Sequence, residues 1–360
     1  MPECQVVMRG LGSTKVVDGA TLRWLLAPDN PAVRFLTLTE LLGRSRRSRE
    51  ARQARAAIMQ TGTVPALLAH EQPDGSFAGR DSFYTAKYRG TVWQLLVLAE
   101  HCADSSDQRV RRACELVLSR SQDPGSGGFS QKHAQRAGGG RPSEVIPCLT
   151  GNMVWSLLRL GYAGDERVSR GIDWLTRYLR FDDGDSAPPA DWPYQRWEMC
   201  YGRHSCFMGV VKGLKALGEI PVPERSPAVR RTIGSGVEFL LRHHIHKQSH
   251  NLNRLAKPGW TRFGFPRMYQ TDVLEITQVL LSLGVRDARM REAITLIASK
   301  RGADGRWRMQ DSFNGKFLVD VEIAGAPSKW ITLNALRVLA KVDAAIPELH
   351  HSPPVPVASD

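Results

Sequence analysis

The stretch Gly151-Asn-Met-Val-Trp-Ser-Leu-Leu-Arg-Leu-Gly161 shows the design that organises the whole chain: a polar start, an apolar helix and a Leu-Gly stop. Similar segments return at intervals of about sixty residues, which is the mark of a repeat architecture. They occupy 33–43, 91–100, 208–218, 272–284 and 332–340. Because each segment is apolar nearly all round, each predicts a buried helix.

A second helix is expected after most of these segments. Its predicted first residue follows Asp107, Asp165, Ser226 or Asp287, and such side chains accept hydrogen bonds from the free N–H groups of a helix start. The segment 111–118, Arg-Arg-Ala-Cys-Glu-Leu-Val-Leu, is amphipathic with a basic outer face. Inner helices that alternate with outer ones predict an all-α fold. We expect an α/α toroid of roughly six inner and five to six outer helices, since stacked hairpins need either capping repeats or closure.

The connections differ in length according to their direction. Inner-to-outer turns are short (103–106, 163–164, 221–225 and 286), whereas the return connections are long (62–90, 123–150, 181–205, 247–270 and 301–329). Loops of more than about 15 residues in a compact domain are usually functional. All inner helices run the same way, so the long loops should share one rim with the inner N-termini. We expect the active site at that rim. The predicted boundaries are an N-terminal extension (1–29), one toroid domain (30–342) and a Pro-rich disordered tail (343–360).

Composition and charge exclude several classes of protein. The chain has 360 residues, 42% hydrophobic content and a net charge of +13. The basic residues are spread along the expected outer helix faces, and no nucleic-acid recognition motif accompanies them, so a nucleic-acid partner is not predicted. No apolar run approaches the ~20 residues of a membrane span. The start has no signal-peptide pattern, and the cysteines have no disulfide-framework spacing. We predict a cytoplasmic protein and leave peripheral membrane contact and the oligomeric state open.

A Gly-aromatic signature lies inside the long loops. It stands at Gln72-Pro-Asp-Gly-Ser-Phe77, at Gln122-Asp-Pro-Gly-Ser-Gly-Gly-Phe129 and at Ala303-Asp-Gly-Arg-Trp307. This pattern resembles the repeat of squalene–hopene cyclases, oxidosqualene cyclases and protein prenyltransferase β subunits, which form the terpenoid cyclase/protein prenyltransferase superfamily. The resemblance runs from Asn30 to Lys341. It implies an α/α toroid whose cavity handles an isoprenoid or similar apolar substrate.

The acid motif of class II terpene cyclases, Asp-x-Asp-Asp, is missing from this sequence. The run Asp182-Asp183-Gly184-Asp185 has the wrong order and is expected to be a solvated turn. Asp272 stands at the start of an inner helix, where the resemblance would place a cyclase acid, although a helix N-cap is an equal alternative. As an acid it would need a raised pKa. Tyr269 and the early inner-helix aromatics Trp93 and Trp155 complete the predicted catalytic set, since π faces stabilise cations.

A metal site is predicted around Glu198-Met-Cys200-Tyr-Gly-Arg-His204-Ser-Cys206. Thiolate and imidazole together suit Zn²⁺, and Cys148, before the preceding inner helix, is expected at the same rim. The predicted ligands are therefore Cys148, Cys200, His204 and Cys206. The alternative is a group of buried thiols packed beside a histidine whose hydrogen bonds are satisfied.

Several polar residues are expected at the same rim and form the predicted substrate-binding set, suited to a diphosphate or carboxylate. They are Lys87, Tyr88, Arg89, Asn152 and Arg262. Three functional hypotheses follow: an isoprenoid-processing enzyme, a zinc-dependent transferase, and a non-catalytic toroid that serves as a binding or scaffold protein. An apolar cavity with a polar rim would support either enzyme, and a cavity filled by side chains would favour the scaffold.

Overall fold

The computed structural model describes residues 17–343, and most of this part of the chain is helical. Every repeat segment predicted to be a buried helix forms one. These inner helices are α2 (Pro31–Leu36) with the π-helical turn η1 (Thr37–Leu41), α5 (Thr91–Glu100), α7 (Pro147–Arg159), α10 (Phe207–Gly218), α12 (Val273–Ser282) and α14 (Lys329–Asp343).

The predicted amphipathic helices are also present. They are α3 (Arg49–Ile58), α6 (Gln108–Arg120), α8 (Glu166–Tyr178), α11 (Pro227–Arg242) and α13 (Arg291–Ser299). The predicted caps are confirmed: the side chains of Asp107, Asp165 and Ser226 accept backbone N–H groups at the starts of α6, α8 and α11. Asp287 caps the short 3₁₀ turn η7 (Ala288–Met290), which leads into α13.

Smaller elements occupy the connections and the start of the described chain. The helices α1 (Gly19–Leu25), α4 (Thr63–Leu68) and α9 (Glu198–Tyr201) are short, and β1 (Lys247–Gln248) pairs antiparallel with β2 (Asn251–Leu255). Further 3₁₀ turns are η2 (Arg80–Ser82), η3 (Lys87–Arg89), η4 (Pro142–Glu144), η5 (Val222–Glu224) and η6 (Pro258–Thr261). α1 lies inside the predicted N-terminal extension. Nearly all of the predicted Pro-rich tail, and Cys4, lie outside the described residues.

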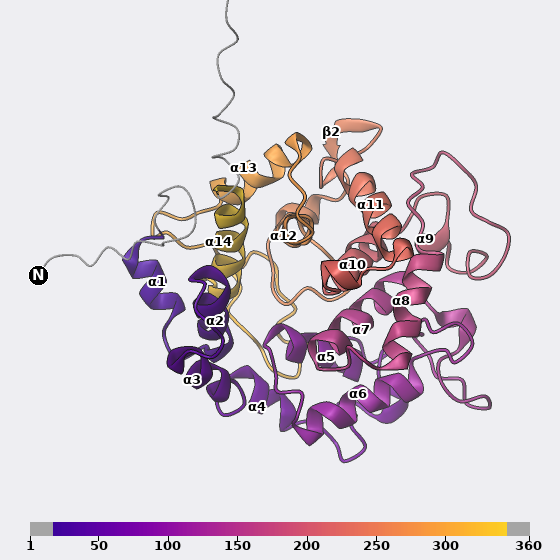
Figure 1. Ribbon diagram of the computed structural model, residues 1–360, viewed down its shortest axis with the longest axis horizontal. Coiled ribbons are helices and arrows are strands. Elements are labelled where there is room, and N and C mark those ends of the chain that lie inside the picture. Colours follow the sequence, from indigo (N-terminus) through magenta and orange to yellow (C-terminus); the bar gives the residue numbers. More distant parts are fainter. Residues whose placement is uncertain (1–16, 344–360) are drawn as a thin grey trace, which may run out of the picture.

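The inner helices are arranged around a common centre, with α6, α8, α11 and α13 outside them (Figure 1). α7 packs against α5 and α10, α10 against α12, and α12 against α14. The closest of these approaches is between α7 and α10, where a Cβ on Gly151 would lie 2.5 Å from the Lys212 carbonyl carbon. α14 in turn packs against α1, α2 and η1, so the last described helix meets the first ones.

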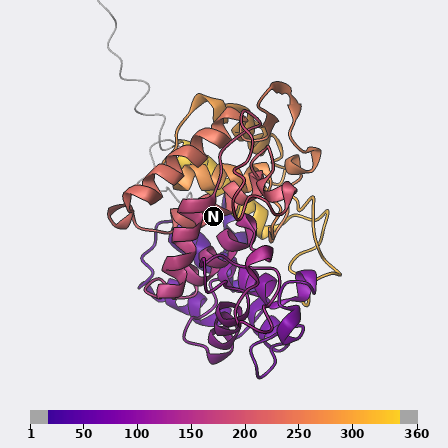
Figure 2. The same cartoon turned by 90° about the vertical axis from the view of Figure 1, so that its right-hand side faces the viewer.

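The long connections cover the N-terminal ends of the inner helices. The segment between α13 and α14 projects on this side, at the right of Figure 2. The segment before α12 turns inward and buries Phe263, Phe265 and Met268. The Phe265 ring stacks on Trp330 of α14 with ring centroids 4.1 Å apart. Much of the loop-bearing end is therefore filled by side chains. None of the helices in residues 17–343 has the length and apolar character needed to cross a membrane.

Candidate functional site

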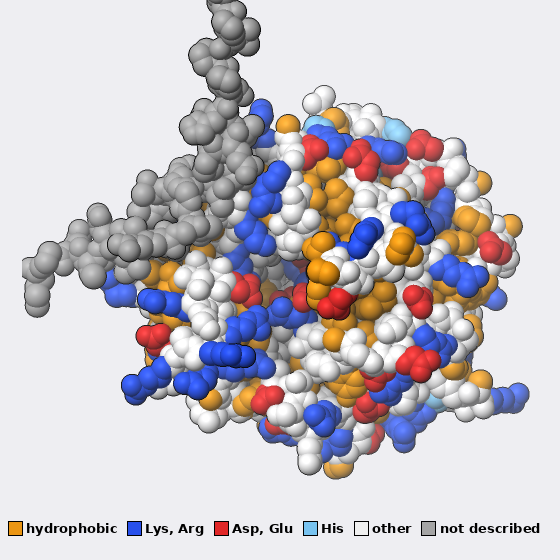
Figure 3. Space-filling view, viewed as in Figure 1, with side chains coloured by type: hydrophobic (Ala, Val, Ile, Leu, Met, Phe, Trp, Pro, Cys, Tyr) orange, Lys and Arg blue, Asp and Glu red, His pale blue; other side chains and the backbone are white. Residues whose placement is uncertain are grey.

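A cavity of about 390 Å³ lies between the inner helices. Its walls come from the last turns of these helices, including Glu100 of α5, Arg159 of α7 and Gly218 of α10. The inward-turning segment from Gly264 to Asp272 lines its deeper part. The hollow is visible at the centre of Figure 3. The cavity therefore opens at the short-turn end, where the inner helices finish, whereas we had expected the site at the rim of long loops.

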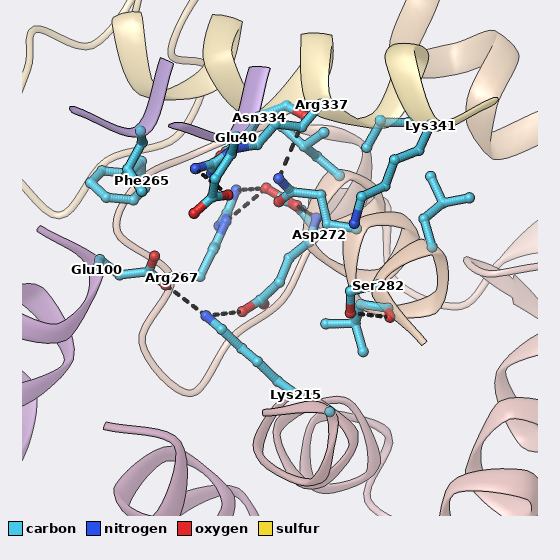
Figure 4. A pocket seen from close by; sticks show the side chains of 18 of the residues that line it. Glu40, Glu100, Lys215, Phe265, Arg267, Asp272, Ser282, Asn334, Arg337 and Lys341 are labelled. Carbon is cyan, nitrogen blue, oxygen red and sulfur yellow. Dashed lines mark hydrogen bonds and ion pairs between the residues drawn. The ribbon is translucent and has the colours of Figure 1, made fainter. Parts of the chain in front are cut away.

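Ten of the 23 residues that line this cavity are charged, and the others include apolar side chains such as Leu274 and Val279 (Figure 4). Five carboxylates and five cations take part, in near balance. They are Glu40, Glu100, Glu219, Asp272 and Glu275, with Arg159, Lys215, Arg267, Arg337 and Lys341. Three of the cations, Arg159, Lys215 and Lys341, stand in the last turns of α7, α10 and α14, where a positive charge offsets the partial negative charge of a helix C-terminus.

A buried network joins α10, α12 and α5. Lys212 is completely buried, and its Nζ lies 2.7 Å from both carboxylate oxygens of Glu275. Lys215 Nζ lies 2.6 Å from Glu100 Oε1 and 3.3 Å from Glu275 Oε1. The same ammonium stands 3.9 Å from the centroid of the Trp155 ring, a cation–π contact.

The charged groups of this network shift one another's pKa values. Burial alone would raise the pKa of Glu275, but Lys212 and Lys215 hold it at about 2. Burial lowers the pKa of Lys212, and Glu275 opposes that shift. The pKa of Lys215 is raised, because Glu100 and Glu275 outweigh the effect of burial. The carboxylate of Glu275 therefore stays ionised at the floor of the cavity.

Asp272 is the N-cap of α12, as one of the two sequence interpretations predicted: its Oδ1 accepts from Glu275 N at 2.8 Å. Its Oδ2 accepts from Gly264 N at 3.2 Å and from Arg267 Nε at 2.7 Å. Arg267 also donates to Asp311 Oδ2 at 2.9 Å. Burial raises the pKa of Asp272, while Arg267 acts in the opposite direction.

The mouth of the cavity carries less tightly held charges. Arg337 Nη2 lies 2.8 Å from Glu40 Oε2, and Trp155 Nε1 donates to Glu219 Oε1 at 3.0 Å. Arg159 lies 3.8 Å from Glu219, a weak contact. Within the part of the chain that the structure describes, Lys341 forms no ion pair. Figure 4 shows its side chain reaching from α14 into the cavity.

The predicted catalytic residues fall at two different ends of the molecule. Asp272 and Trp155 line the cavity. Trp93 and Tyr269 lie at the loop-bearing end with ring centroids 6.0 Å apart, in an aromatic cluster that also contains Tyr88, 5.9 Å from Trp93. The expectation that the two tryptophans occupy related positions is wrong, because Trp93 stands in the first turn of α5 and Trp155 in the last two turns of α7.

The predicted substrate-binding residues do not form one site. Lys87, Arg89 and Arg262 are exposed, and Arg262 donates to the carbonyl of Gln310 at 2.7 Å. Tyr88 belongs to the aromatic cluster, and its hydroxyl accepts from Gln270 Nε2 at 3.2 Å. Asn152 is buried and donates to the carbonyl of Met268 at 3.0 Å, which helps to hold the inward-turning segment.

The predicted zinc ligands are only partly brought together. Cys148, Cys200 and Cys206 lie near enough to affect the pKa values of one another's thiols. His204 is two-thirds exposed and turns instead to Asp183, with its Nδ1 3.6 Å from Asp183 Oδ1. Across residues 17–343 no group of three or more His, Cys, Asp or Glu side chains is placed to hold a metal ion. The donor set therefore does not fit zinc as it stands.

Asp183 was expected in a solvated turn, and that expectation is wrong. Its side chain is 7% exposed and lies among three imidazoles. The nitrogen–oxygen distances are 3.3 Å to His243, 3.6 Å to His204 and 3.7 Å to His250. This carboxylate joins the long connection before α9 to the end of α11 and the β1–β2 hairpin.

The sequence interpretation missed most of the residues that line the cavity. Glu100, Lys215 and Glu219 were not predicted. A signal was present in the apolar segment 207–218, because Lys212 and Lys215 interrupt an otherwise buried helix, and buried charges in such a place are nearly always paired.

Comparison with known proteins shows a distant likeness of fold. No family model matches the chain, and no curated protein matches its sequence. A family 76 glycoside hydrolase from a bovine Bacteroides thetaiotaomicron strain is 15% identical, with 91% of this chain and 68% of that chain covered and a TM-score of 0.46. A variant of the type II terpene cyclase MstE from Scytonema, in complex with geranylgeranyl dihydroxybenzoate, is 16% identical over 91% of this chain and 98% of that chain, with a TM-score of 0.41. A second MstE variant, in complex with merosterolic acid A, is 15% identical with the same coverage and TM-score.

Proposed function

We propose that this protein is an α/α-toroid enzyme that binds a small polar substrate in the central cavity and acts on it by acid–base chemistry. The packing of α14 against α1, α2 and η1 supports closure of the toroid. The single observation that carries the functional proposal is the charged lining. A volume of about 390 Å³ suits a small molecule, and a cavity filled by side chains, which would favour the scaffold hypothesis, is not what lies between the inner helices.

The lining argues for a polar substrate rather than a hydrocarbon. An isoprenoid chain in this space would take water away from the partly exposed carboxylates Glu40, Glu100 and Glu219 and return no hydrogen bond. Each unsatisfied polar group costs on the order of 1–3 kcal/mol. A substrate with hydroxyl, amine or carboxylate groups replaces those hydrogen bonds. Glu100 is well placed to bind it, because Lys215 holds one oxygen while the side chain keeps 22% exposure.

The carboxylates of the cavity have contrasting environments, which is the arrangement expected of an acid–base site. The pKa of Glu275 is held at about 2, and that of Asp272 is raised. Asp272 Oδ2 accepts from Arg267 and Gly264, whereas Oδ1 accepts a single backbone N–H. We propose that Oδ1 carries the proton when Asp272 acts as the acid. In this proposal Asp272 donates a proton, and Glu100, which contacts Lys215, accepts one.

Binding of matched ligand sets tests the proposal. Thermal shift followed by titration calorimetry would compare polar compounds (amino acids, hydroxy acids, sugars and sugar acids) with geraniol and farnesol. We expect a polar ligand to bind and Glu100→Gln to weaken it at least tenfold. Glu238→Gln, the same change on the outer face of α11, should leave affinity unchanged, since Glu238 is 56% exposed. Binding of the isoprenoid alcohols alone, or equal affinity in both variants, would refute the proposal.

Isoprenoid processing is the second candidate, and the aromatic cluster favours it. Tyr88 and Phe313 lie 4.4 Å apart at the loop-bearing end, next to Trp93 and Tyr269. Incubation with geranyl, farnesyl and geranylgeranyl diphosphates, followed by gas chromatography and mass spectrometry, should yield cyclic products that Trp93→Leu abolishes. Recovery of unchanged substrate would exclude this candidate.

A further inference from the structure

A second cavity, of about 260 Å³, shares no lining residue with the central one. It is bounded by the start of α2, the turn into α4, the end of α5 and the connection between α13 and α14. Its volume is slightly below the ~300–1,000 Å³ of sites for drug-sized molecules, so it suits a smaller ligand. None of its lining residues takes part in the acid–base chemistry proposed above.

The imidazole of His101 lines this cavity and brings a buried hydrogen-bond acceptor to it. The residue is 2% exposed, and its Nδ1 lies 2.8 Å from the carbonyl oxygen of Val97. Because a carbonyl only accepts, Nδ1 carries the ring proton and Nε2 carries the lone pair. Burial lowers the pKa of His101 to about 4, so the ring stays neutral near pH 7.

Nε2 of His101 has no hydrogen-bond partner within residues 17–343. The ring is held in place, because it meets Trp330 edge-on with centroids 4.8 Å apart while Nδ1 is bonded to Val97. Buried acceptors in folded proteins nearly always have a partner. A ligand that donates a hydrogen bond to Nε2 would supply one.

Two carboxylates stand at the exposed side of the cavity. The Asp29 side chain is 69% exposed and pairs with Lys329. Asp320 is also exposed, and its Oδ1 accepts from Gly315 N at 2.8 Å. Asp320 has no cationic partner in the part of the chain that the structure describes, so this side of the cavity carries a net negative charge. No three His, Cys, Asp or Glu side chains of that part are placed to hold a metal ion, so an organic cation suits this charge.

The rest of the lining is largely apolar and suits a short alkyl chain. Its apolar residues are Pro31, Ala32, Ile58, Val64, Val319 and Val321. Taking a charge away from water costs far more than taking a hydroxyl away from it. A hydroxyl is therefore the donor that suits the buried imidazole, and an ammonium group belongs at the exposed aspartates.

We propose that this cavity binds a short amino alcohol, whose hydroxyl donates to His101 Nε2 and whose ammonium group meets Asp320 and Asp29. This inference is independent of the proposed function of the central cavity, because the two cavities have separate linings. It assigns a ligand to a buried imidazole that the sequence analysis did not single out.

Isothermal titration calorimetry on the full chain tests this proposal with three compounds that share a four-carbon chain. The probe is 4-aminobutan-1-ol, while n-butylamine lacks the hydroxyl and butane-1,4-diol lacks the ammonium group. We expect the amino alcohol to bind at least about fivefold more tightly than either, because each of the others loses one polar contact. No binding of the amino alcohol, or equal affinity for all three compounds, would overturn the proposal.

Two variants locate the bound compound. His101→Phe keeps a flat ring and removes Nε2, so the affinity for the amino alcohol should fall to that for butylamine, whose own affinity should not change. Asp320→Asn keeps the oxygen that accepts from Gly315 and removes the charge, so binding of both amines should weaken. Unchanged affinity for the amino alcohol in either variant would contradict the assignment.

The matched control is Asp185→Asn, the same change at a carboxylate that is 67% exposed on the connection before α9. It should leave the affinity for all three compounds unchanged, and an effect as large as that of Asp320→Asn would refute the site. Circular dichroism would establish that His101→Phe folds. If it does not fold, the comparison of Asp320→Asn with Asp185→Asn decides the site, because Asp320 is exposed.

Discussion

Glu275 shows at the scale of one residue how the fold tolerates charge in its interior. Its carboxylate meets Lys212 on one side and Lys215 on the other, so that each buried charge has an opposite neighbour. Breaking a buried pair by removing one partner typically costs about 3–5 kcal/mol, whereas replacing both partners by apolar residues is often close to neutral. The network therefore specifies how α10 and α12 meet.

The stability of the protein should depend on the ionisation of Glu275. Because its folded-state pKa, about 2, is below the unfolded value, the contribution is complete above about pH 4.3 and is lost as pH falls toward 2. The expected loss by pH 2.5 is about 2 kcal/mol of unfolding free energy. Urea unfolding between pH 6 and pH 2.5 measures it.

The matched variants for this measurement are Glu275→Gln and the double variant Lys212→Met/Glu275→Leu. Both should show a weaker loss of stability between pH 5 and pH 2.5. The double variant should be more stable than Lys212→Met alone, because it leaves no unpaired charge. An unchanged pH dependence in Glu275→Gln would contradict the assignment.

At the scale of the element, α14 links the two ends of the described chain, since it packs against both the last hairpin and the first helices. Trp330 in its first turn is 1% exposed and stacks on Phe265, which belongs to the inward-turning segment. Trp330→Ala should cost about 3–5 kcal/mol of unfolding free energy by opening a core cavity. Trp330→Phe keeps an aromatic stack and should lose less. The measurement is urea unfolding followed by circular dichroism.

The control is Met199→Ala, a large-to-small change at a side chain that is 88% exposed. It should change the unfolding free energy by less than about 0.5 kcal/mol. Similar effects of Met199→Ala and Trp330→Ala would mean that α14 does not carry the packing we attribute to it.

The helices themselves were predictable from local physical chemistry, but the end of the molecule that carries the cavity was not. Capping residues such as Asp165 and Ser226 signal a helix start through contacts within one turn. Loop length says nothing about where a loop folds. Phe263 and Phe265 turn inward and fill the predicted rim, because burying them stabilises the fold. That contact with α14 spans more than sixty residues of sequence.

Residues of the cavity lining were predictable where the neighbouring sequence marked their position. Asp272 was placed correctly at an inner helix start, and Trp155 does line the cavity. Lys212 and Glu275 are far apart in the sequence, and only the packing of α10 on α12 pairs them. His204 turns to Asp183, a carboxylate that no spacing rule connects with it.

At the scale of the whole molecule, the inner helices finish around a charged cavity, and the long connections cover the other end. The last turns of α7, α10 and α14 supply cations, while Glu40, Glu100 and Glu219 supply carboxylates. The C-terminal ends of the inner helices alone would make this mouth negative, and the cations restore the balance. A substrate with groups of both signs, or with several hydroxyls, matches that balance.

The central claim is that the cavity at the short-turn end is where the substrate binds. The most direct measurement is a crystal structure with the tightest polar ligand from the binding comparison. We expect the ligand to lie between Glu100 and Lys341, within hydrogen-bonding distance of Asp272. A ligand bound instead among Tyr88, Trp93 and Tyr269, with only solvent in the cavity, would contradict it.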